Sequence, residues 1–328
     1  MTVREIIDRI IAKTGMNPLP AECTCDKLIC GSMDQEVTGI VSTFMATVDV
    51  IRKAKEVGAN FIITHEPTWF NGMDKKEWVS EDPVYLEKKK LIEESGMTIW
   101  RFHDYMHMGQ KDEIYKGFDK EFGWEEFRVE IIDTEKYGEK DFNQERFWKN
   151  FGAVYQIPET TLKGLCEFFK EKANMDVVQI VGNPEMRVER VSVLVGGGSL
   201  GLGREEAPMI QMCKENIDVV ICGDITEWTL SAYVRDATML GMNKGMLVMG
   251  HETSGRLAGI SCTRSFGNIC GCGRTLYLFI KILKRISLAR KLAKKNFLHK
   301  GDRKYEKMGN ENAAGYHYAG RDEDTLCR

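Results

Sequence analysis

Short apolar runs rich in β-branched residues alternate with helical patterns along the first 255 residues. The runs predict strands over residues 37–42, 60–64, 97–102, 188–195, 217–222 and 245–249. The stretches between them predict helices over residues 3–14, 46–58, 83–95, 207–216 and 226–241, and a further helix that ends at Lys172 with Thr160 or Thr161 as its N-cap. This alternation predicts an α/β protein whose strands are mostly parallel.

The alternation stops near Gly255, and the charge changes sign at the same place. The 328 residues carry 46 basic and 49 acidic side chains, a net charge of -3. Residues 256–328 contain 16 Lys and Arg against 6 Asp and Glu, whereas residues 1–255 contain 30 against 43. We therefore expect an acidic folded body followed by a basic tail. The composition, 43% apolar and 29% charged, is typical of globular proteins and excludes a disordered or collagen-like chain.

Targeting signals are not apparent in the sequence. The first 15 residues predict an amphipathic helix rather than a secretion signal, and no run reaches the roughly 18 apolar residues of a membrane span. We expect a cytoplasmic protein that binds no membrane and whose ten cysteines are reduced. Cys23, Cys25 and Cys30 lack a matching second pair, which disfavours a metal site built from them.

Four of the six histidines lie in three polar motifs, and each motif directly follows a predicted strand. The motifs are THEP (64–67), FHDYMH (102–107) and GHET (250–253). In an open α/β sheet the carboxyl ends of the strands converge on a ligand crevice. The residues that these strand ends would bring together are His65, Glu66, His103, Asp104, His107 and His251.

Imidazole and carboxylate groups in this number are suited to divalent Zn, Fe or Mn, and a bridging carboxylate is suited to a pair of ions. Such a site lowers the pKa of bound water. We expect His65, His107 and His251 to bind the metal, with Glu66 and Asp104 as further ligands or proton carriers. His103 is predicted to orient the others from outside the ligand set. The alternative is that each histidine is a hydrogen-bonded structural residue of its strand end.

Several longer segments resemble one known family. They are residues 37–74, WRFHDYMH, YQIPETTLKGLCEFFKEK, the strand before GGGS, GDITEW and GHETS, all in the expected order. On these segments residues 1–255 resemble the Nif-three-like dinuclear metal-centre family, often catalogued as GTP cyclohydrolase I type two. The resemblance is closest to a branch that has THEP where most members have two adjacent histidines.

The resemblance implies two α/β lobes with one metal pair between them, and a hexameric ring built from trimers. The lobes would comprise residues 1–108 plus 244–255, and residues 109–243. His65, Glu66 and His251 fall on ligand positions of the family, and His107 falls where most members have a bridging aspartate. The last ligand of the family is a glutamate, and this chain has Gly255 at that position.

Loss of one base in codon 255 would explain both this glycine and the basic tail. Restoring an A within codons compatible with Gly255–Gly259 gives Glu-Glu-Ala-Gly-Arg, and the new frame continues as an amphipathic helical pattern. On this hypothesis residues 256–328 are a poorly ordered product of a frameshift in the gene or in its sequencing.

Three other functions have weaker support. The basic tail lacks interleaved aromatic residues and any DNA-reading motif, so we expect no nucleic-acid partner. Gly196, Gly198 and Gly201 formally match a dinucleotide fingerprint, but the following helix starts late, which favours a turn that at most contacts a phosphate. Cys222 has no histidine close in sequence and is expected to pack inside the sheet.

The histidine motifs predict a metalloprotein, and the family resemblance implies that it is oligomeric. If it is an enzyme, the expected chemistry is metal-assisted hydrolysis of a nucleotide-like or phosphorylated small molecule, with the GTP cyclohydrolase label resting on the family name. The alternative is a non-catalytic metal-binding or regulatory scaffold. Catalytic residues beyond the metal ligands are not predicted.

Overall fold

The computed structural model of the chain describes residues 1–109, 112–131, 133, 135–137 and 147–254. The chain divides into two units, Met1–Phe279 and Ile280–Arg328, and all of the described residues lie in the first. Gly255, the basic tail and the frameshift hypothesis lie outside the described residues.

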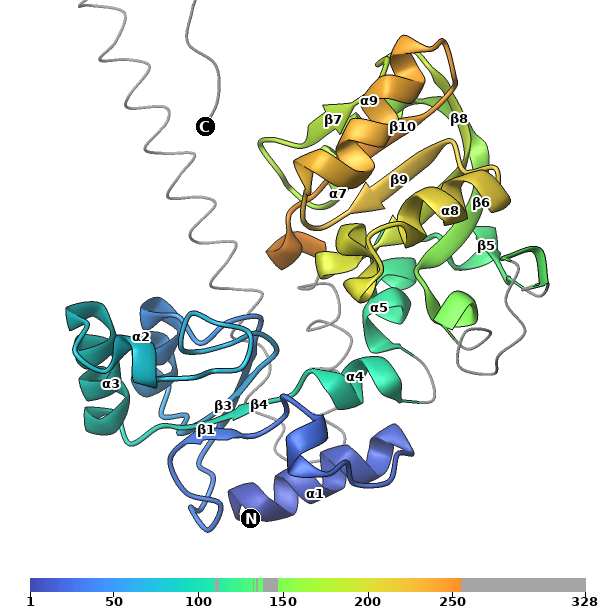
Figure 1. Ribbon diagram of the computed structural model, residues 1–328. Helices are drawn as coiled ribbons and strands as arrows, with labels where there is room; N and C mark the ends of the chain where they lie inside the picture. Colours follow the sequence, from blue (N-terminus) through green and yellow to red (C-terminus); the bar gives the residue numbers. More distant parts are fainter. Residues whose placement is uncertain (110–111, 132, 134, 138–146, 255–328) are drawn as a thin grey trace, which may run out of the picture. The chain divides into compact units, whose positions relative to one another are not determined.

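The first sheet has four strands in the order β1-β4-β3-β2 (Figure 1). Its strands are β1 (Leu28–Cys30), β2 (Ile40–Thr43), β3 (Phe61–Thr64) and β4 (Thr98–Arg101). The central pairs β2–β3 and β3–β4 are parallel, whereas β1 is antiparallel to β4. Every residue of β3 and β4 is buried, which explains why both strands lie in short, largely apolar runs.

The second sheet has six strands in the order β5-β6-β8-β9-β10-β7. Its strands are β5 (Arg128–Val129), β6 (Ala153–Thr161), β7 (Gln179–Val181), β8 (Arg187–Leu194), β9 (Val219–Cys222) and β10 (Gly245–Val248). The pairs β8–β9 and β9–β10 are parallel, and the remaining pairs are antiparallel. Both sheets are thus mixed: the predicted parallel pairing holds at their centres and gives way to antiparallel pairing at their edges.

The helices occupy the segments between the strands. The α-helices are α1 (Val3–Thr14), α2 (Val48–Glu56), α3 (Pro83–Glu94), α4 (Asp104–Met108), α5 (Glu113–Phe122), α7 (Leu162–Lys172), α8 (Ala207–Lys214) and α9 (Ala232–Met239). The short 3-10 helices are η1 (Ala21–Cys23), η2 (Glu77–Val79), η3 (Glu125–Phe127), η4 (Glu135–Tyr137) and η5 (Gly196–Gly203), and η6 (Glu227–Ser231) is a π-helix. The α/β class predicted from the sequence is confirmed.

Local signals set most helix boundaries. Thr2 and Glu5 form a capping box at the start of α1, and Gly15 ends that helix in the left-handed conformation. The side chain of Thr161 accepts a hydrogen bond from the backbone N–H of Gly164, so Thr161 is the N-cap of α7, as predicted.

Two segments differ from the prediction. Residues 153–161 form the long strand β6, which the sequence did not predict because the segment contains Pro158 and polar residues. The register of β6 against β8 shifts between Gln156 and Thr160, which accommodates the proline. The helix predicted over residues 226–241 begins as the π-turn η6, because Thr229 has a non-helical backbone conformation.

The expected lobe assignment of residues 244–255 is wrong for their strand. The resemblance implies that this segment belongs to the first lobe, but β10 pairs in parallel with β9 and antiparallel with β7, in the six-stranded sheet. A four-residue apolar run fits the centre of either sheet, so composition alone does not select one. The connection through α9 places β10 beside β9, as is usual for consecutive strands in an α/β protein.

Apolar side chains cover both sheets. One core cluster joins α1 residues such as Ile6 to strand residues of both sheets, including Phe61 and Tyr155. Cys222 is 1% exposed and packs in the cluster around α8 and α9, as predicted. The described cysteines are free thiols. Across the described part of the chain, no helix combines the length and apolar composition that a membrane span needs.

Candidate metal centre

Three strands lead into the predicted histidine motifs, and a fourth leads into Asp224. In the first sheet, β3 leads directly into His65 and Glu66, and the adjacent β4 leads into His103 and α4. In the second sheet, β10 is followed within three residues by His251, and the adjacent β9 ends two residues before Asp224. Because neighbouring parallel strands end at the same sheet edge, each pair presents its polar residues together.

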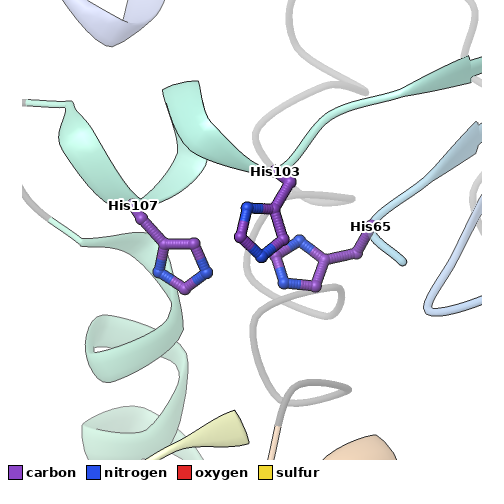
Figure 2. Close-up of side chains that lie close together, drawn as sticks. All are labelled: His65, His103 and His107. Carbon is purple, nitrogen blue, oxygen red and sulfur yellow. The ribbon is translucent and has the colours of Figure 1, made fainter. Parts of the chain in front are cut away.

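Three imidazole rings lie close together at the end of the first sheet (Figure 2). The ring centres of His65 and His103 are 4.5 Å apart and the rings are stacked. The ring centre of His107 lies 5.2 Å from that of His65 and 4.8 Å from that of His103. One ligand atom from each of the three residues lies within 4.8 Å of the others, a spacing at which they can hold one metal ion.

The Nδ1 atom of every histidine in the motifs has a hydrogen-bond partner that can only accept. The four pairs are His65 with the carbonyl oxygen of Phe102 (3.2 Å), His103 with Asp104 Oδ1 (2.8 Å), His107 with Asp112 Oδ2 (3.0 Å) and His251 with Asp224 Oδ2 (2.8 Å). Each Nδ1 therefore carries a proton, so that in the neutral imidazole Nε2 is the nitrogen with a free lone pair.

The Nε2 atoms of three of these histidines lie near one carboxylate oxygen. Oε1 of Glu66 lies 3.1 Å from Nε2 of His251, 3.9 Å from Nε2 of His65 and 4.0 Å from Nε2 of His103. Burial acts to raise the pKa of Glu66, but the hydrogen bond from His251 and the charges of the neighbouring imidazoles lower it to about 2. Glu66 is thus ionised, and its negative charge lies against the imidazoles of His65, His103 and His251.

The other oxygen of Glu66 is held by a buried arginine. Nη2 of Arg101 lies 3.4 Å from Oε2 of Glu66, and Arg101 Nε donates to the carbonyl oxygen of His65 over 3.1 Å. The guanidinium also contacts Asp74, whose carboxylate oxygen Oδ2 lies 3.7 Å from Nη1. Because these contacts fix Oε2, Glu66 presents Oε1 alone to the imidazoles.

The position of the His251 ring depends on its close approach to the backbone of Gly196. A Cβ atom placed on Gly196 would lie 2.7 Å from Nε2 of His251, and the φ angle of Gly196 is +57°. The backbone N–H of Gly196 donates to Oγ of Ser254, which in turn donates to the carbonyl oxygen of His251. The glycine-rich segment η5 therefore positions the late histidine, and Phe44 packs against the His251 ring with 5.4 Å between the ring centres.

The imidazoles differ in their electrostatic setting. Burial lowers the pKa of His65 well below its ordinary value. Burial also acts to lower the pKa of His107, but the hydrogen bond and the charge of Asp112 raise it. Burial likewise acts to lower the pKa of His251, but Glu66 and Asp224, through their hydrogen bonds and charges, raise it. A metal that bound through His107 or His251 would therefore have to displace a proton.

Asp104 and His103 contact each other but have different further neighbours. His103 belongs to the group of three imidazoles, whereas Asp104 lies on the far side of the His103 ring, at Nδ1. The same carboxylate accepts hydrogen bonds from Thr24 Oγ1 and from the backbone N–H of Cys25, both to Oδ2 over 2.8 Å. These bonds and the His103 contact hold the pKa of Asp104 well below its ordinary value.

Sequence reasoning missed Arg101, Asp112 and Asp224. Arg101 ends an otherwise apolar strand, and a charged residue within such a run is a signal of a specific buried partner. Asp224 follows β9 as the histidines follow their strands, so the same strand-end argument could have included it. Asp112 offered no comparable signal, because its contact with His107 depends on the fold of the segment between α4 and α5.

The fold and site define an α/β protein with a histidine-rich candidate metal centre, and comparisons with known proteins place it in a family. The model of the Duf34/NIF3 (NGG1p interacting factor 3) family matches residues 1–258. The chain belongs to this family, which confirms the resemblance inferred from the sequence.

Curated relatives and solved structures agree with this placement. A GTP cyclohydrolase 1 type 2 homolog of Clostridium acetobutylicum is 25% identical over 230 residues, which cover 68% of this chain and 74% of the relative. A protein of the same name from Clostridium perfringens is 23% identical over 231 residues, or 69% of this chain and 77% of the relative. The structure of a Bacillus cereus protein related to NIF3 matches with a TM-score of 0.61 at 16% identity, over 84% of this chain and 94% of that one. The last likeness shows the fold alone.

Proposed function

We propose that His65, Glu66, His103, His107 and His251 bind a divalent metal ion, with Zn, Fe or Mn as candidates and up to two ions per subunit. The observation that carries this proposal is the common arrangement of the histidines. Each Nδ1 donates to an acceptor, and three of the Nε2 atoms lie within 4.0 Å of the ionised Oε1 of Glu66. Nitrogen donors and one carboxylate form a donor set that these metals accept in proteins.

This proposal exchanges the predicted roles of two neighbours. His103 becomes a ligand, because its Nε2 faces Glu66 with the other imidazoles. Asp104 orients His103 through Nδ1, as Asp112 orients His107 and Asp224 orients His251. Carboxylate partners of this kind fix the ring and make the opposite nitrogen a better ligand.

A bound divalent ion would supply Lewis-acid chemistry, polarising a phosphoryl or carbonyl oxygen and lowering the pKa of bound water. The residues of the chain prepare the site for it. Arg101 holds Oε2 of Glu66, so that only Oε1 is available as a ligand or proton acceptor. The ring of Phe44 packs against both His65 and His251, which shields one side of the centre from water.

We propose that the chain is a metal-dependent hydrolase that acts on a nucleotide-like or phosphorylated small molecule. The support is the donor set together with the relatives named GTP cyclohydrolase 1 type 2 homologs. No described residue favours GTP over other phosphorylated compounds, so the substrate class is broader than the name of the relatives.

A scaffold function has one supporting observation of its own. Leu202, Trp228 and Met239 are 68%, 76% and 79% exposed, and burying these side chains between subunits would remove apolar surface from water. We propose that the chain forms a homo-oligomer in the cytoplasm, with the hexameric ring of trimers suggested by the resemblance as the expected state. Light scattering coupled to gel filtration measures this state directly.

Elemental analysis and a turnover screen together distinguish an enzyme from a scaffold. The purified chain and its His65→Ala variant are analysed for metal per subunit and screened for phosphate and formate release from nucleotides. Bound metal with turnover that His65→Ala abolishes supports the hydrolase. Assembly without metal and without turnover would contradict it and favour the scaffold.

A further inference from the structure

Asp104 has a second neighbour besides His103. Its Oδ1 atom lies 2.8 Å from Nδ1 of His103 and 3.4 Å from Sγ of Cys25. Ligand atoms of Cys25, His103 and Asp104 lie within 4.8 Å of one another. A sulfur, a nitrogen and an oxygen donor thus lie together on the Nδ1 side of the His103 ring, whereas Glu66 lies on the Nε2 side.

This group is held in place before any metal binds. Asp26 anchors the loop of Cys25 to the start of α4: its Oδ1 accepts from the backbone N–H groups of His103 and Asp104, and its Oδ2 accepts from that of Tyr105. Oδ2 of Asp104 is fixed by the hydroxyl of Thr24 and the backbone N–H of Cys25. The remaining oxygen, Oδ1, is therefore directed at the thiol and the imidazole.

We propose that Cys25, Asp104 and His103 form a second metal position, which takes a thiophilic divalent ion such as Zn²⁺ through Sγ, Oδ1 and Nδ1. Thiolate, imidazole and carboxylate are the donors that zinc uses, and three protein ligands leave one position open. The charges of the thiolate and the carboxylate balance that of the ion. This position stands independently of the proposed function, although it shares His103 with the histidine site.

The protons can be accounted for on both sides of His103. Burial raises the pKa of the Cys25 thiol to about 12, so a metal must displace its proton, which goes to solvent. When the histidine site is empty, the Nδ1 proton of His103 moves to Nε2. When both sites are filled, that proton also goes to solvent, and His103 would bind to the two ions as an imidazolate anion.

Cobalt(II) provides a direct test, because thiolate ligation produces a charge-transfer band in the near ultraviolet that nitrogen and oxygen ligands do not. The full chain, reduced and stripped of metal, is titrated with Co²⁺ alongside three variants: Cys25→Ser, Cys23→Ser and His65→Ala. Serine at position 25 retains a hydroxyl that can donate to Asp104, which preserves the local hydrogen bond. Cys23 is exposed and two residues away, so Cys23→Ser is the matched control.

We expect the band in the difference between the full chain and Cys25→Ser, and an undiminished band in Cys23→Ser and in His65→Ala. A band of equal strength in Cys25→Ser, or no band in any of the four, would overturn the second position. Loss of the band in His65→Ala would also overturn it, because the sulfur would then belong to the histidine site. Retention in His65→Ala with loss in Cys25→Ser supports this position even if the proposed hydrolase function fails.

Discussion

Oε1 of Glu66 lies 3.1 Å from Nε2 of His251, so the strand ends of the two sheets meet at a single carboxylate oxygen. Glu66 belongs to the end of β3 and His251 follows β10. The Glu66 carboxylate also faces His65 and His103, which makes it the common neighbour of the proposed ligands. Its charge and position should therefore decide whether a metal binds.

Replacing Glu66 with glutamine should weaken metal binding by about 10-fold or more, which corresponds to at least about 1.4 kcal/mol. The substitution keeps the size of the side chain but removes the charge that faces the imidazoles. Isothermal titration with Zn²⁺ measures the change. Glu93→Gln on the exposed surface of α3 is the control, and equal affinities of the two variants would contradict the role of Glu66.

Asp224→Asn should lower metal affinity about 10-fold to 100-fold, because Asp224 fixes the Nδ1 proton of His251. The side chain of Asp224 is 44% exposed, so the fold should tolerate the change. Asp236→Asn, at an exposed pair with Arg235 on α9, is the matched control. If chelator competition gives both variants the affinity of the parent chain, Asp224 does not orient a ligand.

Gly196→Ala should displace His251 and reduce metal binding, because the new Cβ would lie 2.7 Å from Nε2. Gly203→Ala separates this clash from backbone strain: its φ angle is +94°, and a Cβ there meets nothing within 4 Å. Both variants should lose some thermal stability, but only Gly196→Ala should lose metal. The same metal content in the two variants would show that Gly196 is a turn residue and no more.

Metal affinity should rise with pH between about pH 6 and about pH 8, around and above the ordinary histidine pKa of about 6.5. The reason is that the pKa values of His107 and His251 are raised, so both hold protons that a metal must displace. His65, whose pKa is lowered, is neutral throughout this range. Zinc competition at several pH values measures the slope, and an affinity that is flat or falls with pH would contradict the assignment of these two ligands.

Hydrophobic pattern was sufficient to predict the α/β class and the histidine motifs at the strand ends. Short apolar runs such as β3 and β9 are buried strands at the centre of a sheet. The residue that follows such a run lies where the strand ends, at the edge of the sheet. The pattern of apolar residues did not predict β6, because Pro158 and Glu159 lie on an exposed, irregular part of that strand. It also did not assign β10 to its sheet, since strand pairing depends on the whole fold.

The roles within the site were harder to predict than its members. His103 and Asp104 are adjacent in sequence, and only the structure shows which of them faces Glu66. The second group, with Cys25, was not predicted because β1 and the loop before it gave little signal, although their pairing with β4 brings Cys25 to α4. Contacts between residues so far apart in sequence depend on strand register, which a single sequence does not encode in any short motif.

X-ray absorption spectroscopy of the zinc-loaded chain tests the central claim most directly. We predict a first shell that is mainly nitrogen and oxygen, with the outer-shell scattering typical of several imidazoles, and loss of part of that imidazole signal in His65→Ala. A chain that retains no zinc, or a zinc shell without imidazole scattering that His65→Ala leaves unchanged, would contradict a metal centre at the strand ends of the two sheets.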